Sequence, residues 1–227
     1  MHKHRLHGFG IFVCIIIISL TLSVSYACEI EDSPFNDISP NMWYYNDILY
    51  VYNNKLMNGT ETCIFSPDDE VSRSMLITVL YRLAGEPRLR LSVPPFSDLE
   101  EDGYYTNAVN WGSKYGIIKG YEGGAFGPDD AVTREQMSVI LVRYCEYTDY
   151  HLNEIRDYGY FADEDYINWY AKDSVKILYT SGILHGNSNS EFMPQGKATR
   201  AELSALIRRY TESAEKNITI VPKPNYL

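Results

Sequence analysis

Apolar residues recur with a helical period in two stretches of the N-terminal part of the chain, one starting near Trp43 and the other at Ser72. The first stretch is expected to end at Gly59, where glycine would supply a turn with positive φ. The second is expected to end at Gly85, just before a proline that cannot continue a helix. A loop with Phe65 joins them, and this phenylalanine is expected to fill the core beneath the loop. The pattern therefore predicts a helix, a loop and a second helix.

This unit occurs three times along the chain. The phenylalanines of its Phe-x-Asp motif lie 61 and 65 residues apart, and one arginine per unit recurs after 61 and 66 residues. Such spacing indicates a repeat protein, in which each unit buries its apolar face against its siblings. The shared positions are the aspartates Asp37, Asp98 and Asp163, the aromatics Trp43, Tyr104 and Trp169, the glycines Gly59, Gly120 and Gly186, and the arginines Arg73, Arg134 and Arg200.

Together these positions resemble the S-layer homology (SLH) repeat, whose pattern runs Phe-x-Asp, Trp-Tyr, Gly-Ile-x-x-Gly, Phe-x-Pro and Thr-Arg-Ala-Glu. The resemblance covers residues 35–211 and is strong in the second and third repeats, as in Thr199-Arg200-Ala201-Glu202. The first repeat departs from it, with Ser72-Arg73-Ser74-Met75 in place of Thr-Arg-Ala-Glu and with Lys55 where the other repeats have glycine.

The resemblance implies an all-α fold, in which three helix-loop-helix SLH repeats pack as one pseudo-threefold module around a central helical bundle. It also implies binding of an anionic secondary cell-wall polysaccharide in grooves between repeats. The groove of the second and third repeats is expected to bind best, because their motifs are intact. The first repeat is expected to keep its packing role.

The N-terminus predicts a secretory signal peptide, with a basic start, an apolar run from Ile11 to Val24 and small residues before Cys28. An uncleaved anchor and a lipoprotein attached at Cys28 are the alternatives. The predicted organisation is a signal peptide (1–27), a degenerate first repeat (28–88), a second repeat (89–150), a third repeat (151–212) and an extended C-terminal tail (213–227).

Charge narrows the choice of partners. The formal net charge is −10, and it becomes −12 once Lys3 and Arg5 are removed with the predicted signal peptide. This acidity argues against nucleic acid and against an anionic membrane surface as partners. An acidic polysaccharide would therefore have to bind in local cationic pockets.

Cysteine and histidine usage argues against several enzyme classes. Three cysteines remain after the predicted cleavage, in no zinc or redox spacing, and Cys63 and Cys145 could form a disulfide or stay free thiols. Only His151 and His185 remain, which disfavours zinc peptidases, zinc amidases and Cys-His nucleophiles. Gly-x-Ser-x-Gly, phosphate-loop and dinucleotide motifs are also missing from the sequence. The sequence predicts no catalysis, no cofactor and no metal.

The repeated arginines lie in the first turn of the second helices, where the helix dipole disfavours a cation by about 0.3–1 kcal/mol. Each therefore needs a partner, either the aspartate of Phe-x-Asp or the carboxylate or phosphate of a ligand. The residues leave both open, and the resemblance favours a ligand. Thr133 and Thr199 are predicted N-caps, with Gln136 and Glu202 completing capping boxes.

The other repeated positions each have two interpretations. The aspartates could cap the turn into the first helix or accept hydrogen bonds from sugar hydroxyls. The aromatics at Trp43, Tyr104 and Trp169 could anchor the core or stack on a pyranose ring. The glycines could end helices or let a ligand approach the backbone.

The sequence as a whole predicts a secreted, non-catalytic module attached to the cell wall at the cell surface. Its predicted partner is the secondary cell-wall polymer, with envelope proteins as further candidates. The first alternative is an extracellular protein–protein or envelope-assembly module without glycan binding. A cell-wall-modifying enzyme is the third.

Overall fold

The structure is a computed structural model that describes residues 33–89 and 94–217. These residues form six α-helices, one short 3-10 helix and no strands. The predicted signal peptide, its cleavage before Cys28 and the end of the predicted tail (218–227) lie outside the described residues. The helices are α1 (Tyr45–Asn53), α2 (Arg73–Leu83), α3 (Thr106–Lys114), α4 (Arg134–Tyr147), α5 (Lys172–Thr180) and α6 (Arg200–Asn217). The prediction of an all-α, helix-loop-helix repeat fold is confirmed.

The second helix of each repeat begins where the caps predicted. The Thr133 side chain accepts a hydrogen bond from the Gln136 N–H, and the Gln136 side chain accepts one from the Thr133 N–H, which completes the capping box of α4. Thr199 and Glu202 do the same for α6, with donor–acceptor distances of 3.0 and 3.2 Å. Ser72 caps α2 through the Met75 N–H without a returning side chain, as its sequence predicted.

The first helix of each repeat ends earlier than predicted. α1 ends at Asn53, and the left-handed residue after it is Lys55, with φ of 59°, instead of Gly59. Gly116 and Gly182 take the same place in the other repeats, with φ of 71° and 75°. Lys55 therefore adopts a conformation that costs a non-glycine residue roughly 1 kcal/mol. The prediction that Gly59 supplies this turn was wrong.

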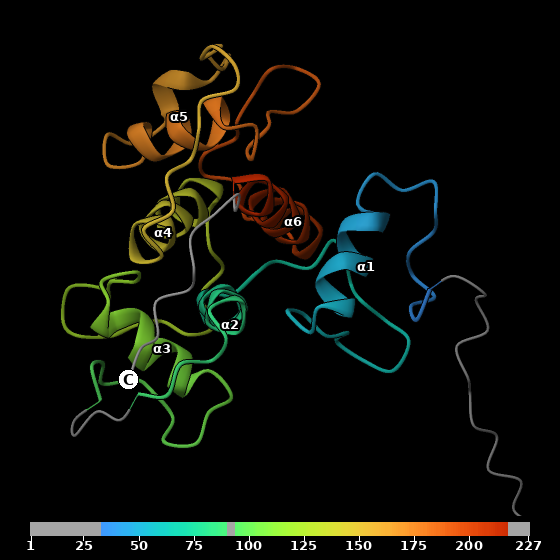
Figure 1. Cartoon of the computed structure of the whole chain (residues 1–227). Helices are drawn as coiled ribbons and strands as arrows, with labels where there is room; N and C mark the ends of the chain where they lie inside the picture. The colour runs from blue at the N-terminus through green and yellow to red at the C-terminus, as the bar shows by residue number, and fades with distance from the viewer. Residues whose placement is uncertain (1–32, 90–93, 218–227) are drawn as a thin grey trace, which may run out of the picture.

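The second helices α2, α4 and α6 lie in the middle of the molecule, with α1, α3 and α5 around them (Figure 1). Each first helix packs against the second helix of the preceding repeat, α3 on α2, α5 on α4 and α1 on α6. Three backbone hydrogen bonds join the starts of the central helices in a closed cycle. They run from Val71 N–H to the Ala198 carbonyl, from Ala198 N–H to Val132 and from Val132 N–H to Val71, at 2.8–2.9 Å. The pseudo-threefold symmetry stays a prediction, which this cyclic order supports.

Each loop between the paired helices is anchored by a buried phenylalanine. Phe65, Phe126 and Phe192 are fully buried beneath them, as predicted for Phe65. Three loop cores of this kind explain why each loop keeps its shape without regular secondary structure.

Two expectations about the remaining residues require correction. Residues 213–217, predicted to belong to an extended tail, continue α6 as helix. Cys63 is disulfide-bonded whereas Cys145 is a free, buried thiol, so the two do not pair with each other. Within residues 33–89 and 94–217, no helix is both long and apolar enough to span a membrane.

Candidate functional site

The repeated arginines connect neighbouring repeats. Each guanidinium donates from Nε and Nη2 to two backbone carbonyls of the next repeat, at the end of the hydrophobic-x-Gly segment and at the buried loop phenylalanine. Arg73 bonds Lys119 and Phe126 at 2.7 and 2.8 Å. Arg200 closes the cycle by bonding Asn58 and Phe65 at 2.7 and 2.9 Å. Arg134 makes the corresponding bonds to the carbonyls of His185 (3.2 Å) and Phe192 (2.7 Å).

These contacts overturn the interpretation that each arginine pairs with the aspartate of Phe-x-Asp. Among the described residues no ion pair joins them, and Arg134 instead forms one with Glu202. Arg73 and Arg200 are 7% and 5% exposed, and burial lowers the pKa of each guanidinium. Carboxylates such as Asp130 near Arg73 and Asp69 near Arg200 partly offset that effect at a distance. Both arginines remain cationic at neutral pH because an arginine pKa lies far above 7.

The aspartates of Phe-x-Asp bind the loop that follows the first helix, and they do not cap the turn into it. Asp98 accepts from the backbone N–H groups of Phe126 and Gly127, both at 2.7 Å. Burial alone would raise the pKa of Asp98, but these N–H donors hold it below its usual value. Asp37 and Asp163 bind the loop N–H groups of their own repeats in the same way, at 2.6–3.1 Å.

The three repeated aromatics are exposed, and the interpretation of them as core anchors is wrong. Trp43, Tyr104 and Trp169 are 62%, 65% and 86% exposed, whereas the tyrosines that follow Trp43 and Tyr104 are buried. An exposed indole or phenol ring is available to stack on a sugar face. The Tyr104 hydroxyl also lies 3.0 Å from that of Ser74, which places this ring at the start of α2.

The glycines at the end of the hydrophobic-x-Gly segment have a packing role. A Cβ on Gly59 would lie 2.8 Å from the Phe35 ring, and one on Gly186 would lie 3.0 Å from the Phe161 ring. A side chain at either position would push against the phenylalanine of Phe-x-Asp. Gly120 is crowded in the same way by Phe96. Of these glycines, Gly186 also lines the groove described next.

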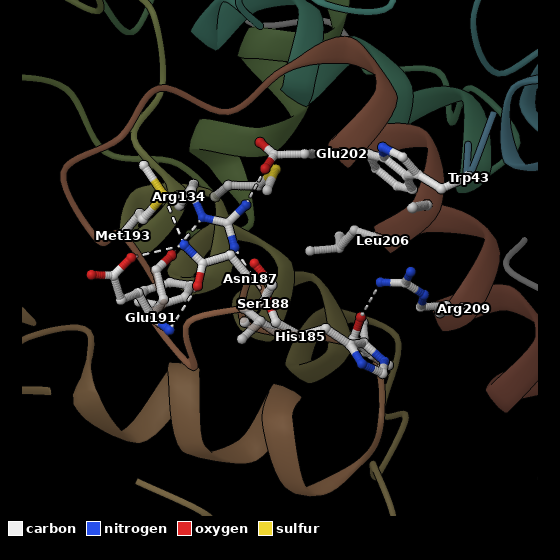
Figure 2. Close-up of a pocket in the computed structure, with 16 residues that line it drawn as sticks. Trp43, Arg134, His185, Asn187, Ser188, Glu191, Met193, Glu202, Leu206 and Arg209 are labelled. Atoms are coloured by element: carbon white, nitrogen blue, oxygen red, sulfur yellow. Dashed lines mark hydrogen bonds and ion pairs between the residues drawn. The ribbon is translucent and has the colours of Figure 1, made fainter. Parts of the chain in front are cut away.

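A groove of about 590 Å³ brings together three of the twelve predicted site residues, Trp43, Arg134 and Gly186. Trp43 comes from the first repeat, Arg134 from α4, and the remaining wall from residues 183–193 and from α6. Figure 2 shows Arg134 with Glu191 and Met193 at one end and Arg209 with His185 at the other. The groove thus combines an exposed aromatic, an apolar floor with Leu206 and cationic groups at both ends.

Several groove residues lie outside the positions that the sequence singled out. Arg209, on α6, donates to the Ile183 carbonyl at 3.3 Å, and His185 Nε2 lies 3.1 Å from the Gly182 carbonyl. Glu202 was identified from the sequence only as a capping residue, yet it also pairs with Arg134. Nothing in the repeat pattern places these side chains on the same surface, because that depends on how the third repeat packs.

A buried carboxylate outside the groove joins the second and third repeats. Glu135 is 1% exposed and accepts hydrogen bonds from the Tyr170 hydroxyl and the Asn168 side-chain amide at 2.5 and 2.7 Å. Burial alone would raise the pKa of Glu135, but these donors lower it below its usual value. Within the described part of the chain, no cluster of three or more histidine, cysteine, aspartate or glutamate side chains is arranged to hold a metal ion.

Comparison with known proteins assigns the repeats. The family model described as "S-layer homology domain" matches residues 34–74, 95–138 and 161–204. An endoglucanase of Bacillus sp. (strain KSM-635) is 27% identical over 87% of this chain and 21% of its own length. An amylopullulanase of Thermoanaerobacterium thermosulfurigenes is 32% identical over 80% of this chain and 10% of its own length.

The relatives also include surface-layer proteins. An S-layer protein of Bacillus thuringiensis subsp. finitimus is 26% identical over 77% of this chain and 21% of its own length. The chain thus spans about a fifth or less of the length of these relatives. What the enzymes and the S-layer protein share with this chain is the region of the repeats.

Proposed function

This chain belongs to the S-layer homology family, and from that premise we propose that it binds an anionic cell-wall polysaccharide in the groove between Trp43 and Arg134 without catalysing a reaction. The family match and the S-layer relatives support a cell-surface anchoring module. The polysaccharide as ligand, secretion and the absence of catalysis are the proposal.

The observation that carries the proposal is the composition of the groove. Trp43 lines the groove and is 62% exposed, so its ring can stack on a pyranose without any change in the protein core. Arg209, which forms no ion pair among the described residues, gives one end of the groove a local positive charge within an acidic protein, whereas the charge of Arg134 is paired with Glu202. A local cationic site of this kind is what an acidic polymer requires when the overall field of the protein repels it.

The enzyme relatives do not carry their activity over to this chain. The endoglucanase and the amylopullulanase share 21% and 10% of their lengths with it, in the region of the repeats. The carboxylates in the groove, Glu191 and Glu202, are hydrogen-bonded to Asn187 and to the start of α6. We therefore assign them to structure and not to glycosidic bond cleavage.

The first experiment measures co-sedimentation of the purified protein with wall sacculi of a Gram-positive host, before and after acid removal of the secondary polymer. Trp43→Ala removes the stacking surface, and Tyr160→Ala removes an 80% exposed tyrosine that does not line the groove. Co-sedimentation should be lost on acid treatment and in Trp43→Ala but kept in Tyr160→Ala. A folded wild-type protein that stays in the supernatant would reject wall binding and favour a protein partner.

A further inference from the structure

Resting on the proposed function, we propose that the anionic substituent of the sugar, a carboxylate or a phosphate ester, binds at the Arg209–His185 end of the groove and not at the motif residue Arg134. The two ends differ in how many of their charges and donors are already satisfied. Figure 2 shows them on opposite sides of the groove.

At the Arg134 end, each of the three guanidinium nitrogens already bonds to the protein. Nε and Nη2 donate to the carbonyls of Phe192 and His185, and Nη1 forms an ion pair with Glu202. Glu191 lines the same end. A bound anion there would be repelled by the carboxylate of Glu202 or would have to displace it from Arg134. This end can position a sugar, but it offers no uncompensated positive charge.

At the other end, Arg209 has donors to spare. Among residues 33–89 and 94–217, its only hydrogen bond runs from Nη1 to the Ile183 carbonyl, and no carboxylate forms an ion pair with it. The carboxylates that attract it, Asp47 and Glu212, are each bonded to Arg208, at 3.3 and 2.7 Å. A guanidinium carries five N–H donors. Most of those on Arg209 therefore remain for a ligand.

The surroundings of Arg209 add positive charge. Arg208 and Arg156 both lie close enough to disfavour its charged form, and burial is the largest cause of its lowered pKa. Arg156 donates to the carbonyls of Tyr179 and Leu184, both at 2.6 Å, so its guanidinium is fixed against the backbone of residues 179–184. Half-buried cations that repel one another are stabilised by an anion between them.

His185 completes this end of the groove. Burial is the largest cause that lowers the pKa of its imidazole, Arg209 and Arg156 lower it further, and the contact with the Gly182 carbonyl offsets part of the effect. An anion beside Arg209 would offset both arginines and raise that pKa. Trp43 and Leu206 line the same side (Figure 2), and they offer an apolar surface to the pyranose ring that carries the anion.

The equivalent residues of the other repeats show which features of the Arg209–His185 end are particular to the third repeat. Arg82 occupies in the first repeat the place of Arg209, nine residues after the motif arginine, and donates to the corresponding carbonyl of Leu56 at 3.0 Å. The first and third repeats therefore share that backbone bond, whereas Arg143, at the same position of the second repeat, makes no such bond among the described residues. The position of His185 is Asn58 in the first repeat, so the imidazole is particular to the third.

The test is a pH titration of the His185 imidazole by NMR in the purified protein, with its signal assigned by His185→Gln. Glucuronate and glucose 6-phosphate are the two anionic probes, and glucose is the neutral control. Both anions, or one of them, should raise the titration midpoint of His185 by at least about 0.5 pH unit, and glucose should not. The anion that produces the shift identifies a carboxylate or a phosphate as the substituent.

Two variants assign the effect to the arginine. Arg209→Gln should abolish the shift and Arg209→Lys should retain part of it, because the charge remains. Arg82→Gln removes the same kind of backbone hydrogen bond outside the groove and should leave the shift intact. An equal shift in Arg209→Gln, or no shift in the wild type with either anion, would overturn the assignment. Wall co-sedimentation of the same wild-type protein reports on the proposed function separately.

Discussion

Replacing Glu202 with glutamine should tighten binding of an anionic ligand without unfolding α6. One oxygen of Glu202 accepts a hydrogen bond from the Thr199 N–H at 3.0 Å, and the other forms the ion pair with Arg134. Gln136 provides the same cap to α4 as a neutral amide, through a 3.1 Å bond to the Thr133 N–H. Glu202→Gln therefore keeps the cap and removes the charge.

The expected stability change is small. The side chains of Arg134 and Glu202 are 14% and 28% exposed, so solvent partly screens their ion pair. Pairs of this kind contribute about 0.2–1 kcal/mol, and the free energy of unfolding should fall by no more than about 1 kcal/mol.

The expected gain in affinity is larger. For an assumed separation of roughly 7 Å between the bound anion and Glu202, Coulomb repulsion amounts to roughly 0.6 kcal/mol at the dielectric constant of water and roughly 2.4 kcal/mol at an effective value of 20. Loss of that repulsion corresponds to roughly threefold to sixtyfold tighter binding. The groove is open to solvent, so we expect a value in the lower part of this range.

Isothermal titration with soluble, acid-released wall polymer measures the change, and urea denaturation measures stability. Glu146→Gln is the matched control, because it removes the same charge beside another arginine, Arg143, outside the groove and away from Arg209. It should change affinity by less than twofold. Unchanged or weaker binding in Glu202→Gln, with stability preserved, would refute the idea that this carboxylate repels the bound anion.

Three further predictions concern stability and reactivity. Arg200→Met should lower the free energy of unfolding in urea by about 3 kcal/mol, because it leaves the carbonyls of Asn58 and Phe65 unpaired; a loss below about 1 kcal/mol would contradict its role as an inter-repeat link. Because the pKa of Asp98 is lowered on folding, the unfolded chain takes up its proton first, so stability should fall as pH drops below about 4, and Asp98→Asn should flatten that part of the urea-midpoint profile. Burial raises the pKa of the Cys145 thiol to about 12, so it should react with a thiol reagent at pH 8 only after denaturation, and rapid labelling of the folded protein would show that it is accessible.

Local features of the fold could be predicted because their causes lie within a few residues of one another. The caps at Thr133 and Thr199 need only a partner three residues away, and the structure has both. The end of α1 was placed wrongly because Lys55 adopts a left-handed conformation without glycine. Propensity along the first repeat does not predict that choice, but the alignment of Lys55 with Gly116 and Gly182, which also have positive φ, points to it.

The candidate site could be predicted only in part. The repeat pattern identified Trp43 and Arg134, which share the groove, but it also placed Arg200 in the better-binding repeats and named Arg73, and both of these are almost fully buried. The exposure of a side chain depends on which repeat covers it. The same motif therefore has different surroundings in each repeat when the neighbouring repeats differ in sequence. Arg209 recurs in the other repeats as Arg82 and Arg143, nine residues after each motif arginine, but that recurrence does not show that Arg209 is the one that lines the groove.

The sequence by itself determined the number of repeats, the helix-loop-helix unit and the starts of the second helices, because these follow from periodicity and from contacts a few residues apart. Only the tertiary structure decided what each arginine binds, since Arg73 and Arg200 reach carbonyls 46 and 142 residues away. It also decided that Cys63 and Cys145 do not pair, and that Arg209 and His185 face one groove. Such contacts depend on how three similar units close on one another, and spacing along the chain does not carry that geometry.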